Sequence, residues 1–107
     1  MWHLVQESLA AWDFKEHVEY LASRELDAAL RFVDAVELAY QRISENPETG
    51  FIYGFESIRL RDVRALIVPE FPNHLVFFRK QSDEVRVLRV LHASRDIVRE
   101  FEGHEPC

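Results

Sequence analysis

The segment of residues 69–96 constrains the fold more than any other part of the chain, because it holds two apolar runs separated by a short polar stretch. The first run, residues 75–78 (LVFF), has no polar side chain to place on a solvated face. The second run, residues 85–91, is nearly as apolar apart from its arginines. The intervening residues 81–84 (QSDE) have the composition of a turn. We therefore predict two adjacent strands that are covered on more than one side.

Two helical patterns precede these strands. Residues 2–7 form a candidate strand, and Ser8 is a candidate cap for an amphipathic helix over residues 9–22. A longer helical pattern then continues to about residue 45. The turn-forming sequence of residues 46–50 (NPETG) ends it.

Each helical pattern has an apolar stripe at helical spacing. The stripe of the first helix comprises Ala10, Phe14, His17, Val18 and Leu21. The stripe of the second comprises Ala29, Phe32, Val36, Ala39, Tyr40 and Ile43. The charged residues of the first helix, Asp13 among them, are placed off its buried face, and His17 is interpreted as a core-boundary residue without a chemical role. The small alanines favour close packing of the two helices as an antiparallel hairpin.

The period changes again in the second half of the chain. Residues 58–61 (IRLR) alternate between apolar and basic side chains, and residues 64–68 form another short apolar run, so both are predicted to be strands. A short helix is predicted at about residues 94–102. The fold class is α+β: an N-terminal strand, then an antiparallel helical hairpin packed on a mainly antiparallel sheet of three to four further strands, then the C-terminal helix. Residues 1–107 are expected to form a single domain.

Charge is distributed unevenly along the chain. Residues 1–50 carry ten acidic and four basic side chains, whereas residues 51–107 carry nine of each, and eight of these nine bases are arginine. The net charge of -6 argues against direct binding of free nucleic acid, which usually needs an excess of lysine and arginine. Arginine is suited to bidentate contacts with carboxylate or phosphate, so its dominance favours specific contacts over a diffuse basic surface.

The sequence also indicates a compartment. Cys107 is the only cysteine, which excludes an intrachain disulfide and favours a reducing environment. No signal-peptide pattern or membrane-spanning run is found. We expect a soluble cytoplasmic protein without a membrane partner.

No enzyme motif stands out. The chain has three glycines, which are not clustered into a phosphate-binding loop, and no paired metal-ligand spacing is present. His92 and Asp96 are four residues apart, but two ligands do not make a metal site. No serine is placed beside a base, as a hydrolase triad requires. We therefore predict neither a metal nor a cofactor.

The arginines of the second half are the remaining candidates for function. The set, mostly on predicted strands, is Arg59, Arg61, Arg79, Arg86, Arg89 and Arg95. On one face of a sheet they could bind RNA phosphates and stabilise the charge of a cleaving phosphodiester, while His92 moves a proton. The alternative is a purely structural role, in which acidic residues of the same chain neutralise these arginines. The chemistry of the residues alone favours this structural role.

Residues 71–79 (FPNHLVFFR), followed by residues 85–96 (VRVLRVLHASRD), closely resemble the signature of the RelE/ParE toxin superfamily, and the ParE branch fits best. Further features of that superfamily extend the resemblance over nearly the whole chain: Asp13-Phe14 and Tyr20-Leu21, Ala28-Ala29 with Phe32, Asn46-Pro47 with Gly50, and Ile58-Arg59. One departure is Phe78, where the family often has tyrosine. The resemblance implies the toxin of a type II toxin-antitoxin (plasmid stabilisation) pair, bound by a small cognate antitoxin whose C-terminal segment wraps around it.

The two branches of the superfamily imply different functions. ParE-like toxins inhibit DNA gyrase or a related topoisomerase by binding, whereas RelE-like toxins cleave messenger RNA on the ribosome. This chain is acidic and nothing after Asp96 looks like the catalytic end of the RelE-like nucleases, so the resemblance favours the ParE-like activity, with the arginines as a partner-facing surface.

Two alternatives stay open. One is a ribosome-dependent endoribonuclease that uses Arg59, Arg61, Arg79, His92 and Arg95. The other is a non-toxic, degenerate member of the family that retains antitoxin binding. Antitoxin wrapping predicts an exposed apolar groove along the sheet or the helical hairpin.

Overall fold

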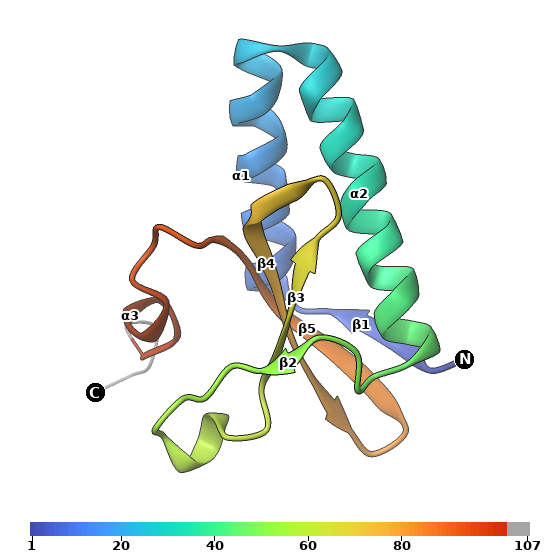
Figure 1. Ribbon diagram of the computed structural model, residues 1–107, viewed down its shortest axis with the longest axis vertical. Helices are drawn as coiled ribbons and strands as arrows, with labels where there is room; N and C mark the ends of the chain where they lie inside the picture. Colours follow the sequence, from blue (N-terminus) through green and yellow to red (C-terminus); the bar gives the residue numbers. More distant parts are fainter. Residues whose placement is uncertain (103–107) are drawn as a thin grey trace.

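The computed structural model, which describes residues 1–102, has a five-stranded sheet with helices against it (Figure 1). The elements in chain order are β1 (His3–Gln6), α1 (Ser8–Arg24), α2 (Leu26–Glu45), β2 (Phe51–Ile52), the 3-10 turn η1 (Ile58–Leu60), β3 (Arg64–Val68), β4 (Phe71–Gln81), β5 (Glu84–His92) and α3 (Ile97–Glu102). The strand order is β1-β5-β4-β3-β2. Only β1 and β5 pair in parallel. The α+β fold class predicted from the sequence is confirmed.

The β4–β5 hairpin is the centre of the sheet, as the two apolar runs predicted. Its register places Val76 opposite Val90 and Leu75 opposite Leu91. Phe77 and Phe78 are both 0% exposed, although they are consecutive and belong to different core clusters. Successive side chains of a strand point to opposite faces, so both faces of β4 must be covered.

The helical hairpin of α1 and α2 covers one face of the sheet (Figure 1). Phe32 and Val36 of α2 form a core cluster with Phe78 and Val87 of the sheet. Ala10 and Ala39 are completely buried, in agreement with the close packing that the alanine pattern predicted. Glu25 alone separates the two helices.

The opposite face is covered by the segment between β2 and β3 and by α3. Phe55 and Leu60 from that segment form a second core cluster with Phe77 and with Ile97 of α3. Phe101 packs against the same cluster, 5.3 Å from Phe77 between ring centroids. The C-terminal helix is therefore part of the folded core and not an appendage.

Two sequence-based predictions about element ends were wrong. Ser8 is the first residue of α1 and not its cap; the N-cap position belongs to Glu7, which makes no side-chain capping bond. The C-terminal helix begins at Ile97 and not near residue 94. The chain first makes a turn in which the Arg95 N–H donates to the His92 carbonyl, and the Asp96 carboxylate then accepts the Arg99 N–H as a helix cap does.

The predicted strand at residues 58–61 was also wrong, because this segment is the 3-10 turn η1. Leu60 is buried in the second core cluster, whereas Ile58 is 77% exposed, so the alternation of side chains does not continue through the segment. Turn hydrogen bonds from the Leu60 and Arg61 N–H groups replace strand pairing. A four-residue alternation is too short to distinguish a strand from a turn with one buried side chain.

Within residues 1–102, no helix combines the length and the apolar character needed to cross a bilayer. Cys107, on which the expectation of a reducing compartment depends, lies outside the described residues.

Candidate functional site

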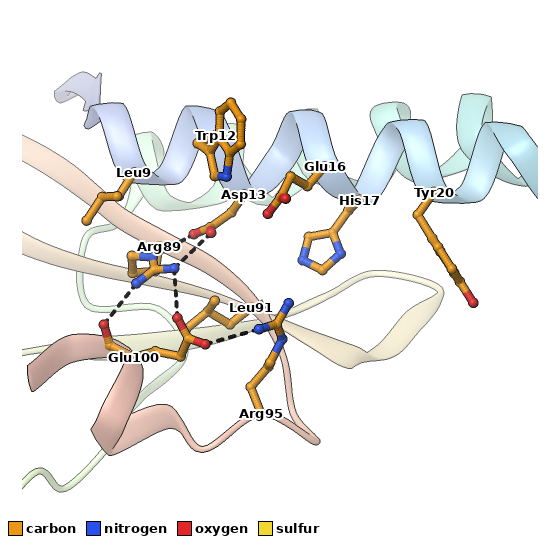
Figure 2. A pocket seen from close by; sticks show the side chains of 10 residues that line it. All are labelled: Leu9, Trp12, Asp13, Glu16, His17, Tyr20, Arg89, Leu91, Arg95 and Glu100. Carbon is orange, nitrogen blue, oxygen red and sulfur yellow. Dashed lines mark hydrogen bonds and ion pairs between the residues drawn. The ribbon is translucent and has the colours of Figure 1, made fainter. Parts of the chain in front are cut away.

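A cleft of about 450 Å³ lies between α1 on one side and β5, the turn after it and α3 on the other. Figure 2 shows side chains of α1 on one wall, with β5, the following turn and α3 on the other. The residues that line it are Leu9, Trp12, Asp13, Glu16, His17, Tyr20, Arg89, Leu91, Arg95 and Glu100. The cleft therefore combines an apolar rim with a charged interior.

Arg89 and Asp13 form a buried ion pair at the floor of this cleft. Arg89 is 6% exposed and Asp13 is 5% exposed. The guanidinium Nε lies 2.7 Å from Asp13 Oδ2 and Nη2 lies 2.9 Å from Oδ1, which is bidentate geometry. These hydrogen bonds raise the pKa of Arg89 above its ordinary value. The sequence-based placement of Asp13 off the buried face of its helix was wrong.

The carboxylate of Asp13 also completes the sheet. β1 pairs with β5 only as far as Val87, so the outer edge of β5 beyond that residue has no strand beside it. There α1 takes over: Asp13 Oδ2 accepts the Val90 N–H at 3.0 Å, and His17 Nε2 lies 3.2 Å from the Val90 carbonyl. A carbonyl only accepts, so Nε2 carries the proton.

Glu100 connects α3 to the same network. Its carboxylate lies 3.1 Å from Arg89 and 3.2 Å from Arg95, one oxygen to each. Its backbone carbonyl also accepts a hydrogen bond from Arg89, at 3.0 Å. Figure 2 shows this chain of contacts running from Asp13 through Arg89 and Glu100 to Arg95. The network holds α1, β5 and α3 together.

The rim of the cleft carries large apolar side chains that face solvent. Leu9, Trp12 and Tyr20 of α1 are 41%, 55% and 58% exposed. We call these three residues the α1 stripe. Because the rest of the cleft contains charged groups, the stripe gives it an amphipathic character that suits a protein segment.

The remaining candidate arginines lie outside the cleft, and two of them are bound internally. Arg79 forms a bidentate pair with Asp62, at 3.1 and 2.6 Å, and also donates to the Arg59 carbonyl. These bonds hold the pKa of Asp62 below its ordinary value. Arg86 pairs with Glu84 at 3.0 Å and with Glu7 at 3.3 Å. Arg59 and Arg61 are exposed and belong to η1 and the residue after it, not to a strand.

The structure separates the residues considered for RNA cleavage into two groups. Arg79 of β4 lies near η1, beside Arg59 and opposite Arg86 in the sheet. His92 lies opposite His74, so it is five residues from Arg79 along β4, roughly 17 Å at the rise of a strand. Its Nδ1 accepts the Ser94 N–H at 3.0 Å. A general acid or base must reach the reacting group by a hydrogen bond, and these two groups cannot share one phosphodiester in this arrangement.

Three histidines that are distant in sequence lie in contact, and one of them, His17, lines the cleft. The rings of His17 and His92 each meet His74 edge-on, with centroids 4.9 Å apart. The His74 Nδ1 is buried without a hydrogen-bond partner. Burial, reinforced by the other two histidines, lowers the pKa of His74 to about 4, and burial also lowers the pKa of His17. In the described part of the chain, no cluster of three or more histidine, cysteine or acidic side chains is arranged to hold a metal ion.

Sequence reasoning missed the importance of Asp13 and of Arg64. A signal for Asp13 was present: it lies three residues after Ala10 and four before His17, which places it at the edge of the buried stripe. Arg64 donates to the carbonyls of Glu48 and Thr49 and so holds the segment after α2. Nothing in the local sequence marks that role.

A comparison of the sequence with known protein families identifies the family of this chain. Residues 4–97 match the sequence model described as the ParE toxin of the type II toxin-antitoxin system parDE. The chain belongs to the ParE toxin family. The resemblance to the ParE branch of the superfamily is thereby confirmed, and the chain is a toxin-family member of a type II toxin-antitoxin system.

A solved structure agrees with this membership of the ParE family. The chain is similar to a protein of the chromosomal ParDE TA system from P. aeruginosa, with a TM-score of 0.72 and 19% sequence identity over 88% of this chain and 98% of that chain. At this identity the similarity concerns the fold. A search of the curated proteins gave no match.

Proposed function

We propose that this ParE-family chain arrests DNA replication by binding DNA gyrase or a related topoisomerase, and that a cognate antitoxin holds it inactive. The observation that carries the choice of binding over catalysis is the separation of the candidate nuclease residues. Arg79 is committed to Asp62, and His92 lies at the other end of the β4–β5 pair. Such an arrangement supports partner recognition rather than RNA cleavage at a single centre.

The cleft beside α1 supports the second half of the proposal. The α1 stripe extends over twelve residues, from Leu9 to Tyr20, and the eleven rises between them correspond to about 16 Å of helix. An amphipathic helix of the antitoxin could place its apolar side against this stripe, as in other helix-in-groove complexes. The exposed apolar side chains of α1 therefore support antitoxin binding beside the helical hairpin.

Inducible expression tests the proposal in cells. We expect growth arrest with early loss of DNA synthesis and intact transcripts, relieved when the protein encoded by the adjacent open reading frame is produced together with the toxin. In vitro, the purified chain should inhibit supercoiling by gyrase. Rapid cleavage of ribosome-bound transcripts, lost on His92→Ala or Arg61→Ala, would overturn the topoisomerase proposal.

Two further outcomes separate the parts of the proposal. A chain that binds the adjacent gene product but neither stops growth nor inhibits gyrase would be the non-toxic family member. For the cleft, Trp12→Ala should weaken antitoxin binding about tenfold. Leu30→Ala, which removes a side chain of similar exposure on α2 (57%), is the matched control and should not change the affinity.

A further inference from the structure

The two arginines of the cleft are neutralised in different ways. Arg89 is buried and keeps two bonds to Asp13 whatever Glu100 does. Arg95 is 57% exposed at its side chain, and in residues 1–102 the only carboxylate within ion-pair distance of it is that of Glu100, at 3.2 Å. Arg95 is thus the positive group of the cleft that an incoming partner can reach.

The Glu100 carboxylate can separate from Arg95 without leaving the buried charge of Arg89 unpaired. The Glu100 side chain is itself about one-fifth exposed (21%), so water can replace the contacts of its carboxylate when it moves. Arg89 retains the bidentate carboxylate of Asp13, as well as the Glu100 backbone carbonyl. The Glu100–Arg95 pair is a solvent-screened pair, and such pairs contribute little to stability. By contrast, removal of Asp13 would leave Arg89 buried without its bidentate partner.

The position of Arg95 defines what a partner must present there. Figure 2 shows Arg95 on the wall facing α1, below Glu16 and His17. The apolar side of a helix lying on the α1 stripe would contact Leu9 and Trp12 at one end. At the end of the cleft near His17, a side chain of that helix would meet Arg95. Burial lowers the pKa of His17, so the positive charge at this end comes from the arginine.

We propose that the cleft recognises an acidic side chain on an amphipathic helix of the antitoxin, and that Glu100 occupies the place of that carboxylate on Arg95 in the free toxin. Binding is then an exchange of carboxylates, in which Glu100 competes with the partner. This inference depends on the proposed antitoxin binding and specifies its chemistry.

The test uses the full chain and the purified product of the adjacent open reading frame, with affinities measured by calorimetry at two salt concentrations. Arg95→Gln should raise the Kd about fivefold and reduce its salt dependence, because the exchanged ion pair is lost. Glu100→Gln should lower the Kd about threefold, because the competing charge is gone. In the double variant, Glu100→Gln should no longer improve binding, since the two effects are coupled through one site.

Arg99→Gln is the matched control, because it removes an exposed arginine of α3 that does not line the cleft, and it should change the Kd less than about twofold. Circular dichroism checks that each variant is folded; Arg95 is exposed, so its variant keeps the test valid if Glu100→Gln loosens α3. If wild type binds and Arg95→Gln behaves like Arg99→Gln, the inference is overturned and the antitoxin proposal survives. If wild type does not bind, both fail. A homodimer whose dissociation constant changes with Arg95→Gln would assign the cleft to a second copy and also overturn the inference.

Discussion

The carboxylate of Asp13 performs two tasks that are usually given to different residues. It neutralises the buried guanidinium of Arg89, and it accepts the N–H of Val90 at the uncovered edge of β5. A buried ion pair adds little net stability compared with a well-packed apolar pair, but its disruption is costly because one charge stays behind unpaired. The site is therefore sensitive to substitution at one partner.

We predict that Asp13→Ala destabilises the protein by about 3–5 kcal/mol, since Arg89 would lose its bidentate partner and the Val90 N–H its acceptor. Urea unfolding followed by circular dichroism measures the change. Asp34→Ala removes an exposed acid from α2 and should stay within about 0.5 kcal/mol of wild type. A similar small effect for Asp13→Ala would contradict the assigned role of the ion pair.

A second single residue, His74, makes the stability of the protein depend on pH. Its pKa falls from 6.5 to about 4 in the fold, because burial and the nearby rings of His17 and His92 oppose its protonation. Asp13 and Arg95 act on the adjacent His17 with opposite signs. The unfolded state therefore binds this proton more readily than the folded state. The protein keeps its full stability above pH 6.5 and loses part of it as the pH falls from 6.5 towards 4.

His74→Phe should remove this loss. Between pH 7 and pH 4, we expect the unfolding free energy of the variant to fall by about 2 kcal/mol less than that of wild type. This value is smaller than the whole pKa shift would give, because the ring is not wholly buried. Parallel denaturant titrations at the two pH values give the difference. His3→Gln, which changes an exposed histidine of β1, is the control, and identical pH profiles for His74→Phe and wild type would contradict the prediction.

At the scale of elements, the segment between α2 and β3 depends on one glycine and one arginine. Gly50 has φ +74, and a Cβ atom there would lie 2.2 Å from the Ala65 carbonyl oxygen. Gly54 has φ +93, but a Cβ atom added there would meet nothing within 4 Å. Arg64 holds the carbonyls just before Gly50. The chain therefore offers two glycines with similar backbone strain and different surroundings.

Gly54→Ala should destabilise the protein by about 1 kcal/mol, the usual cost of a left-handed conformation for alanine. Gly50→Ala should cost at least about 3 kcal/mol, because the β3 backbone must also move. Thermal unfolding of the two variants compares them directly. Equal midpoints would show that the close approach to Ala65 does not constrain the segment.

The elements also show what the sequence could reveal. Long patterns were sufficient: the apolar runs predicted β4 and β5, and the alanine-rich stripe predicted the hairpin, because many residues report the same burial. Short patterns were not, as residues 58–61 demonstrate. The cleft depends on contacts between Asp13 and Arg89, which are 76 positions apart, and no local spacing encodes such a pair. The arginine set was recognisable, but its separation into two groups followed only from the strand register.

At the scale of the whole molecule, the acidic net charge of -6 is combined with arginines of which several are paired with acids of the same chain. The two shortest ion pairs in residues 1–102 join Arg79 to Asp62 and Arg89 to Asp13. Phosphate binding depends on cations that can release counterions from the nucleic acid. We infer that the molecule offers a weak electrostatic footprint for free nucleic acid.

We therefore predict no saturable binding of short labelled RNA or duplex DNA at physiological salt, with any dissociation constant weaker than about 10⁻⁴ M. Fluorescence anisotropy is a suitable measurement, and a basic nucleic-acid-binding protein of similar size serves as the positive control. Micromolar binding with a steep dependence on salt would contradict this view of the surface.

The strand order has a consequence for the life of the protein during its synthesis. β1 precedes β5 by about eighty residues in the chain, yet the two are neighbours in the sheet, where Leu4 lies beside Val85. Such a contact cannot form until β5 has emerged from the ribosome, and long-range pairing of this kind slows folding. During translation Asp13 likewise lacks Arg89. A growing chain therefore cannot complete its sheet, or pair the carboxylate of Asp13, until β5 has been made.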